Sequence, residues 1–179
     1  MNRPLRVAIV GAASSGKTTL AARLAQHYGT IWVPEYLREF VDTQARLPVS
    51  SDQIHIARTQ LAREEAALPL AHRFLFCDTT PLMTAVYSRH YFDGLDAELD
   101  ALAAAHRFHY DVTLVCAPDL PWVPDGLMRE PEDVSGAVSA LLLHELAVRG
   151  VPYTLVSGAP DQRLIKVEQV LGRPATLAG

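Results

Sequence analysis

The sequence has no cluster of basic residues and no long hydrophobic run. Its 179 residues carry a net charge of −4 at pH 7. Because such a chain has no strong positive field to attract a polyanion, we expect no nucleic-acid partner. No apolar stretch approaches the length of a membrane span, so we also expect no membrane partner.

Cysteine is scarce as well. The two cysteines, Cys77 and Cys116, each end an apolar run, and nothing near them has the spacing of metal ligands. We therefore interpret them as buried, reduced thiols. A strand pattern begins by Leu5, which predicts the absence of a signal peptide. Together these features predict a cytoplasmic protein.

Short apolar runs alternate along the chain with stretches of helical periodicity. Such runs are typical of strands that are buried on both faces, so the pattern predicts an α/β fold with a parallel sheet and helices on both faces. The length and ordinary composition favour one domain over residues 1–179. The five predicted strands are residues 5–10, 30–33, 73–77, 111–116 and 152–156.

Residues that are typical of helix ends support the prediction of helices between these strands. Ser50 and Gln53 have the spacing of a capping box, and Pro69 ends the apolar stripe that follows them. Thr80 and Pro81 have the pattern of an N-cap and a first-turn proline.

Lysine is rare, because only Lys17 and Lys166 are found among the sixteen basic residues. Lys17 lies in GAASSGKT, residues 11–18, which fits the phosphate-binding pattern G-x-x-x-x-G-K-[ST] between a predicted strand and a predicted helix. Backbone N–H groups at a helix start bind anions, the lysine reaches the β- and γ-phosphates, and the Thr18 hydroxyl is a ligand for Mg²⁺. We therefore expect ATP or GTP to bind with Mg²⁺ at Gly11, Ala13, Ser14, Ser15, Gly16, Lys17, Thr18 and Thr19.

Two carboxylates end predicted strands, at the edge where open α/β sheets bind ligands. Asp78 follows the third run, where it can hold Mg²⁺ or accept a proton from an attacking hydroxyl. Capping the next helix is its alternative role. Glu35 follows the second run and is placed to meet a hydroxyl. The sequence leaves open which of the two is the base.

The residues after Glu35 are further candidates. Tyr36 and Arg38 adjoin it and are assigned to the substrate site. Glu39 follows Glu35 by one helical turn. For Arg38 and Glu39, ordinary ion pairs on a solvated helix face are an equal alternative.

A long proline-rich connection, APDLPWVPDGLMREPED, follows the fourth run. Loops of this length are usually functional, and a lid over residues 117–133 would exclude water from phosphoryl transfer. Arg129 is the loop's only arginine and could neutralise charge on the migrating group. Trp122 either stacks on a flat ring or packs the loop onto the domain.

Two histidines and three aromatic residues have competing interpretations. His106 and His109 are three residues apart but lack a third ligand nearby, which favours packing or surface roles over a metal site. For Tyr87, Tyr91 and Phe92 we favour positions in the core over contacts with a cofactor.

The chain resembles the ribosylnicotinamide kinase family, the kinase portion of bacterial NadR-like proteins. The similarity covers nearly the whole chain and includes GAASSGKTTLAARLAQHYG, VPEYLREFV, FCDTTPLMTAVYSRHY, HYDVTLVCAPDLPWVPDGLMRE and the final VEQVL helix. The resemblance implies a three-layer P-loop kinase fold with strand order 2-3-1-4-5. It also implies that the ATP γ-phosphate is transferred to the 5′-hydroxyl of nicotinamide riboside.

The same resemblance implies roles for individual residues. It places Lys17 and Thr18 at ATP and Mg²⁺, Asp78 or Glu35 as the base, Trp122 on the pyridinium ring, and Asp125 and Arg129 at the acceptor and lid. Two other interpretations remain. The protein could phosphorylate another nucleoside or small metabolite, or it could be a nucleotide-dependent switch that uses water as the acceptor. The sequence does not predict an oligomeric state.

Overall fold

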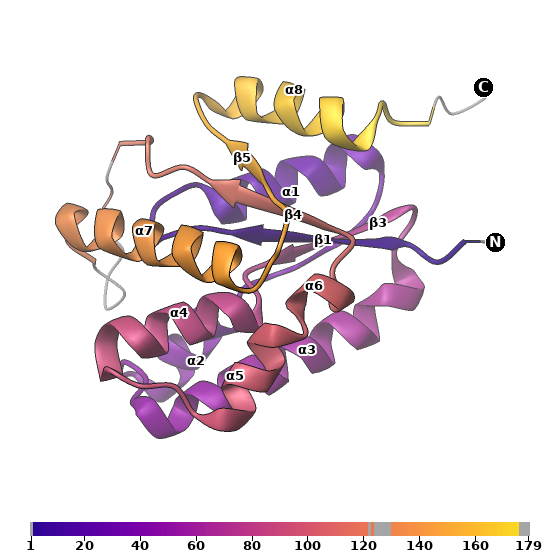
Figure 1. The fold of residues 1–179 in the computed structure, drawn as a ribbon. Coiled ribbons are helices and arrows are strands. Elements are labelled where there is room, and N and C mark those ends of the chain that lie inside the picture. The colour runs from indigo at the N-terminus through magenta and orange to yellow at the C-terminus, as the bar shows by residue number, and fades with distance from the viewer. Residues whose placement is uncertain (1, 122, 124–129, 176–179) are drawn as a thin grey trace.

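The computed structural model describes residues 2–121, 123 and 130–175, and its centre is a five-stranded sheet (Figure 1). All neighbouring strands are parallel, in the order β2-β3-β1-β4-β5. The predicted α/β class, the five strands and the strand order implied by the family resemblance are thereby confirmed. The strands are β1 (Leu5–Val10), β2 (Trp32–Val33), β3 (Phe74–Asp78), β4 (Val112–Cys116) and β5 (Thr154–Val156).

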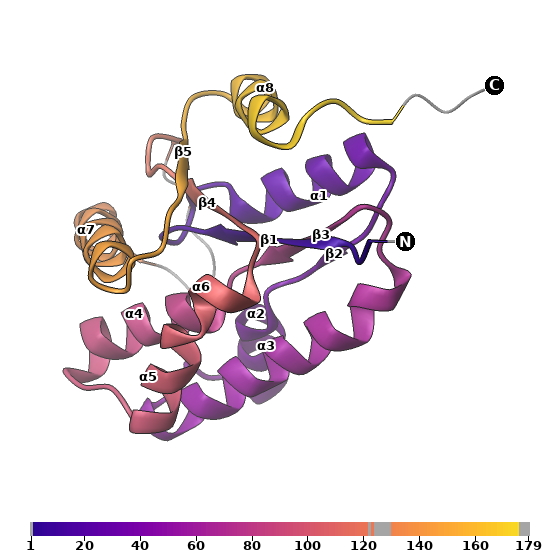
Figure 2. The same cartoon turned by 45° about the vertical axis from the view of Figure 1, so that its right-hand side comes forward.

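Helices cover both faces of the sheet, which gives three layers. Helices α1 and α8 lie together on one face, and α3 to α7 lie on the other (Figures 1 and 2). The helices are α1 (Lys17–Tyr28), α2 (Tyr36–Gln44), α3 (Gln53–Ala67), α4 (Pro81–Phe92), α5 (Ala97–Ala104), α6 (His106–His109), α7 (Glu132–Val148) and α8 (Pro160–Leu171).

The strands are apolar on both sides because each face carries its own core. Leu24 of α1 and Val167 of α8 pack with Phe76 and Leu114 on one face. On the other face a second cluster joins Val10, Leu82, Leu99, Leu142 and Leu146. Strand β3, which lies between β2 and β1, is buried along its whole length, as a strand between two layers must be.

The start of α3 differs from the sequence prediction. Residues Ser50–Asp52 form a short 3₁₀ turn, and α3 begins at Gln53. The predicted capping box of Ser50 and Gln53 is wrong, because a carboxylate takes that role. Asp52 Oδ2 accepts a 2.8 Å hydrogen bond from the backbone N–H of Val49. A charged acceptor at the third position makes a stronger cap than an amide.

Asp78 ends β3, and the phosphate-binding sequence follows β1, directly beside it in the sheet. Ile9 of β1 pairs with Asp78 in the parallel register. Because all five strands run the same way, their carboxyl ends meet at one edge, and side chains far apart in the sequence come together there.

Across the part of the chain that the structure describes, no helix is both long and apolar enough to span a bilayer.

Candidate functional site

The loop between β1 and α1 has a conformation that only a few residue types allow. Gly16, the N-cap of α1, has a φ of 85°, and Ser14 also has a positive φ, of 59°. A Cβ on Gly11 would lie 2.9 Å from the Cys116 carbonyl oxygen, which is too close. The two glycines of the motif are therefore required by local geometry.

A cavity of about 160 Å³ opens over this loop. Lys17 is 7% exposed, and its Nζ donates a 3.0 Å hydrogen bond to the Ala12 carbonyl oxygen. Gly11 and Ser15 belong to the loop but are buried, and they do not line the cavity. The lining residues are Ala13, Ser14, Gly16, Lys17, Thr18, Thr19, Glu35, Arg38 and Tyr87.

Asp78 lies at the side of this loop and is fully buried. Its Oδ2 accepts a 2.6 Å hydrogen bond from the Thr18 hydroxyl, while Oδ1 is buried and has no hydrogen-bond partner among the described residues. Burial, followed by the nearby Glu35 carboxylate, raises the pKa of Asp78 to about 6. Lys17, Thr18 and Arg38 act in the opposite direction.

Glu35 lies where two cavities meet. It is the N-cap residue of α2 and lines both the phosphate-loop cavity and a larger cavity beside it. The Thr79 hydroxyl donates a 3.2 Å hydrogen bond to Glu35 Oε1. Thr79 has a φ of 74°, which is strained for a β-branched residue. Such strain next to Asp78 marks this strand end as a candidate functional position.

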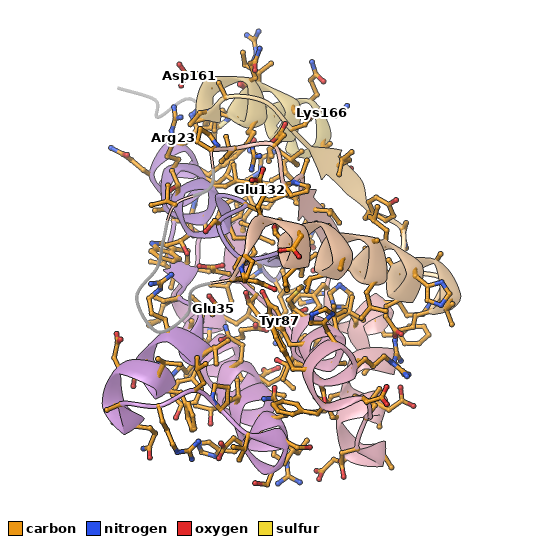
Figure 3. The ribbon with its side chains drawn as sticks, turned by 90° about the vertical axis from the view of Figure 1, so that its left-hand side faces the viewer. Arg23, Glu35, Tyr87, Glu132, Asp161 and Lys166 are labelled. Carbon is orange, nitrogen blue, oxygen red and sulfur yellow. The ribbon has the colours of Figure 1, made fainter. Side chains whose placement is uncertain are left out.

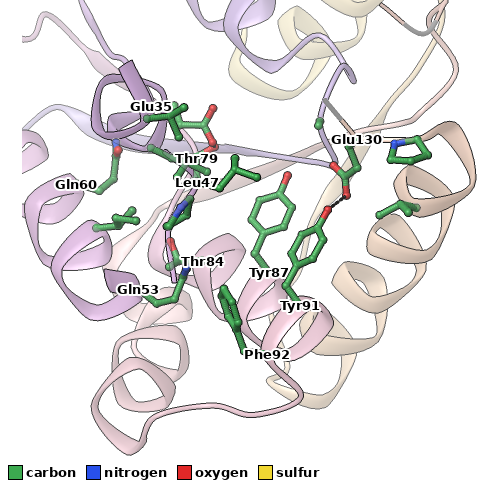
Figure 4. Close-up of a pocket in the computed structure, with 17 residues that line it drawn as sticks. Glu35, Leu47, Gln53, Gln60, Thr79, Thr84, Tyr87, Tyr91, Phe92 and Glu130 are labelled. Carbon is green, nitrogen blue, oxygen red and sulfur yellow. Dashed lines mark hydrogen bonds between the residues drawn. The ribbon is translucent and has the colours of Figure 1, made fainter. Parts of the chain in front are cut away.

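The larger cavity has a volume of about 390 Å³ (Figure 4). Tyr87 and Tyr91 form part of its wall, with their rings stacked at a centroid distance of 6.1 Å and an angle of 23°. The Tyr91 hydroxyl donates a 2.9 Å hydrogen bond to Glu130 Oε1. Our prediction that Tyr87, Tyr91 and Phe92 are core residues holds for Tyr87, which packs against the second core cluster and also lines this cavity. It is wrong for Tyr91, which is 51% exposed. Phe92 lines the cavity as well.

Three polar side chains face the same cavity from α3 and α4. Gln53 and Gln60 are nearly buried on one side of α3, and Thr84 projects from α4 (Figure 4). Gln60 Oε1 accepts a 2.9 Å hydrogen bond from the Tyr36 backbone N–H. The remaining wall is largely apolar, which suits a flat ring of a small molecule. Apolar lining residues include Leu37, Val41, Leu47, Pro48, Ile56 and Val134.

The three candidate residues that follow Glu35 have different surroundings in the structure. Arg38 lines the phosphate-loop cavity. Glu39 forms a two-point ion pair with Arg63, at 2.6 and 2.8 Å, so the ion-pair interpretation holds for Glu39. The Tyr36 ring lies under Arg63 and contacts His55, and Tyr36 lines neither cavity as described. The structure therefore does not bring Tyr36 to the predicted substrate site.

Three predicted residues of the long connection, Trp122, Asp125 and Arg129, lie outside the residues that the structure describes. Residues 117–121, 123 and 130–133 of this connection are described, and among their contacts are two with the phosphate loop and α8. Ser14 Oγ donates a 3.2 Å hydrogen bond to the Val123 carbonyl oxygen. Asp119 Oδ1 lies 2.5 Å from Nη2 of Arg163, a buried arginine on α8.

His106 is buried between two threonines. Its Nε2 lies 2.9 Å from the Thr113 hydroxyl, and its Nδ1 lies 3.4 Å from the hydroxyl of Thr80, the N-cap of α4. Burial lowers the pKa of His106 to about 3. Within the described residues, no group of three or more His, Cys, Asp or Glu side chains could hold a metal ion.

Several residues at the two cavities and the phosphate loop were not among the predicted site residues, namely Thr79, Tyr87, Tyr91, Gln53, Gln60, Thr84, Glu130 and Arg163. A signal existed for some of them. Tyr87 and Tyr91 are one helical turn apart, and Gln53 and Gln60 are two turns apart, on helices that begin at the functional edge of the sheet. A polar residue that repeats on an otherwise apolar face suggests a lined cavity. Nothing in the sequence marks Arg163.

The fold and the loop between β1 and α1 define a P-loop nucleotide-binding domain. Figure 3 labels Glu35 and Tyr87, which line the cavity over this loop. A family model described as an AAA domain matches residues 6–163, and the chain belongs to this family.

Comparison with individual proteins agrees with this assignment. The chain is 28% identical over 173 residues to the "Trifunctional NAD biosynthesis/regulator protein NadR" of Salmonella typhimurium (strain LT2), covering 92% of this chain. A crystal structure of NadR protein in complex with NAD and AMP-PNP superposes with a TM-score of 0.80 at 23% identity, covering 98% of this chain and 52% of that chain. A structure of NadR protein in complex with NR gives 0.78 at 22% identity, covering 98% and 54%.

These comparisons confirm the resemblance to NadR-like P-loop proteins. The chain spans 41% of the length of the Salmonella relative.

Proposed function

We propose that this protein is a kinase that transfers the γ-phosphate of ATP to a hydroxyl of a small ribosylated acceptor, with nicotinamide riboside as the first candidate. Two NadR structures support this choice, because their complexes contain AMP-PNP, an ATP analogue, and NR, the usual abbreviation of nicotinamide riboside. The acceptor assignment depends on similarity, whereas the geometry argues for transfer between two bound molecules.

The observation that carries the proposal is the meeting of two cavities. One is lined by the phosphate loop and the other is larger and mainly apolar, and both are lined by Ala13, Glu35 and Tyr87. A hydroxyl in the larger cavity would therefore face the end of a triphosphate held by the loop. A hydrolytic switch needs only a water molecule there and has no need for a second cavity of about 390 Å³.

The site also fits Mg²⁺. The Thr18 hydroxyl and the Asp78 carboxylate are hard oxygen donors that already contact each other, and Asp78 Oδ1 is buried without a partner in the part of the chain that the structure describes. Mg²⁺ in kinase sites takes few protein ligands, because phosphate and water oxygens complete its octahedron. Thr18 and Asp78 would hold the ion, which when bound neutralises charge on the phosphates.

Each remaining residue has a proposed task in the transfer. The acceptor oxygen forms a bond to the γ-phosphorus while the bond from phosphorus to the β–γ bridging oxygen breaks and ADP leaves. Glu35 takes the hydroxyl proton, since it lines both cavities while Asp78 lines neither. Lys17 and Arg38 supply positive charge at the phosphates.

The residues outside the described ranges keep their proposed roles. Arg129 would neutralise charge from the lid, Trp122 would stack on the acceptor ring, and Asp125 would contact the acceptor.

Measurement of ADP release tests the proposal. Purified protein is given Mg-ATP alone, and then with nicotinamide riboside, adenosine, thymidine or uridine, and the products are identified by mass spectrometry. We expect slow release without an acceptor and fast release, with a phosphorylated product, when nicotinamide riboside is present. Turnover of equal speed without any acceptor would instead support the nucleotide-dependent switch.

Thermal unfolding provides an independent measure of acceptor binding. An acceptor at a hundred times its Kd stabilises the native state by about 2.7 kcal/mol, which raises Tm visibly. If Tm rises with another nucleoside but not with nicotinamide riboside, the proposed kinase activity stands and the other nucleoside becomes the proposed acceptor.

A further inference from the structure

Among the described residues, Arg163 is the largest side chain that is fully buried, at 2% exposure. An arginine remains charged in proteins, so burying one is costly unless its N–H groups find acceptors. Arg163 lies in the first turn of α8 and finds its acceptors outside that helix.

The guanidinium group contacts three separate loops at the carboxyl edge of the sheet. Nη1 donates a 2.5 Å hydrogen bond to the Ser15 carbonyl oxygen in the phosphate loop. Nη2 donates to Ala117 O at 3.0 Å and to Asp119 Oδ1 at 2.5 Å, both after β4. Nε donates to Gly158 O at 2.9 Å, after β5.

Asp119 completes this arrangement. Its Oδ2 accepts a 2.7 Å hydrogen bond from the backbone N–H of Gly158. The hydrogen bonds of Arg163 and Asp119 therefore connect the loops that follow β1, β4 and β5. A planar guanidinium with five N–H donors suits such a junction, and an ammonium group does not.

The contact with Ser15 determines the direction of a backbone amide. In a trans peptide the carbonyl and the following N–H point to opposite sides, so a carbonyl fixed toward Arg163 directs the N–H of Gly16 away from it. Gly16 lines the phosphate-loop cavity. Its φ of 85° is accessible to glycine along with many other values, so without Arg163 the Ser15–Gly16 peptide could rotate at little cost.

We propose that Arg163 is a positioning residue for the triphosphate site: it holds the Ser15–Gly16 peptide so that the Gly16 N–H faces the phosphates. This inference rests on the proposed nucleotide-binding function. It assigns Arg163 no contact with substrate, because its effect passes through the backbone of the loop.

A solely structural role for Arg163 would be to hold α8 in place. Other contacts already do so, since Val167 and Leu171 lie in the core and Arg23 pairs with Asp161 at 2.5 Å. Loss of the Arg163 side chain should therefore leave α8 docked while the phosphate loop loses its fixed geometry.

The test compares Arg163→Gln with Arg149→Gln. Arg149 is a matched control because it is also largely buried and pairs with Glu145 and Asp100, at 3.0 and 2.6 Å, at the far end of α7. Titration calorimetry with ATP and with inorganic tripolyphosphate, which has phosphates alone, gives affinities, and thermal unfolding gives Tm.

We expect Arg163→Gln to weaken both ligands about tenfold, since amide hydrogen bonds to charged groups are strong. Arg149→Gln should lower Tm without changing either affinity by more than twofold, and Arg163→Lys should fall between wild type and Arg163→Gln. The KM for ATP should rise while that for the acceptor stays constant. A folded Arg163→Gln protein with wild-type affinity for tripolyphosphate would overturn the inference.

The variant Asp119→Asn tests the same inference if Arg163→Gln does not fold. The Asp119 side chain is 39% exposed, so its substitution leaves Arg163 in place and removes one charged partner. We expect about threefold weaker tripolyphosphate binding, and unchanged binding contradicts the inference. Wild-type protein that ignores both ATP and tripolyphosphate would refute the proposed function itself, a result distinct from variants that bind as well as wild type.

Discussion

The Thr18 hydroxyl donates a 2.6 Å hydrogen bond to Asp78 Oδ2, although the two residues are 60 positions apart in the sequence. The contact exists because β1 and β3 are parallel neighbours, which places the first turn of α1 beside the end of β3. It joins the two oxygen donors that we propose for Mg²⁺.

Replacement of Lys17 should abolish turnover and leave the fold intact. The Lys17 ammonium contacts the Ala12 carbonyl oxygen in the loop and belongs to neither core cluster. We expect Lys17→Ala to show no measurable ADP release and a Tm close to that of wild type. Lys166→Ala is the control, since the second lysine is exposed on α8. Wild-type activity in Lys17→Ala would remove the nucleotide site from the phosphate loop.

Glu35→Gln and Asp78→Asn should have different kinetic effects. A general base contributes about 10² to 10⁴ in rate, so Glu35→Gln should lower kcat by that factor with little change in the KM for ATP. Asp78→Asn should raise the Mg²⁺ concentration needed for half-maximal activity. Steady-state kinetics over a magnesium series separates the two.

Glu39→Gln is the control for this pair of variants, because Glu39 is exposed and paired with Arg63. The roles are reversed if Asp78→Asn loses kcat at saturating magnesium while Glu35→Gln does not.

The fold could be predicted largely from the sequence, because each element has a local signal. The strands were indicated by apolar runs and the phosphate loop by an eight-residue pattern. Asp78 and Glu35 could be found as well, since polar residues at the ends of parallel strands meet at one edge.

What the sequence did not reveal depends on distant contacts. Tyr87 and Tyr91 have the helical spacing of core residues, and only the position of α4 beside α3 turns them toward a cavity. Arg163 is one of many arginines on the helices, and only the tertiary structure brings it to Ser15. Our proposal of Glu35 over Asp78 as the base rests on the shape of two cavities, which no sequence pattern encodes.

The stacked tyrosines should determine acceptor affinity. Tyr91→Ala removes a ring that packs on Tyr87 beside the larger cavity. An aromatic pair between Tyr91 and the ring of the acceptor would contribute about 0.5 to 1.5 kcal/mol beyond burial. Its loss should therefore raise the acceptor KM roughly threefold to tenfold, while the KM for ATP stays the same. Tyr91→Phe keeps the ring and loses only the hydrogen bond to Glu130, so its effect should be smaller.

Phe108→Ala is the matched control for Tyr91→Ala, because Phe108 is an exposed aromatic residue, at 80%, that lines neither cavity. Equal acceptor KM values for wild type, Tyr91→Ala and Phe108→Ala would place the acceptor elsewhere.

His106 should make the stability of the protein depend on pH. Burial lowers its pKa from 6.5 to about 3, so between these values the unfolded chain binds a proton that the native state does not. The free energy of unfolding is therefore highest above pH 6.5, where His106 is neutral in both states. It decreases by about 1.4 kcal/mol per pH unit as the pH falls below 6.5.

The variant His106→Gln tests this dependence, because glutamine can pair with Thr80 and Thr113 but does not titrate. Urea unfolding at pH 7 and pH 5 should therefore show that wild type loses about 2 kcal/mol more than the variant. Equal losses in the two proteins would mean that His106 is protonated in the folded state or is not buried in solution.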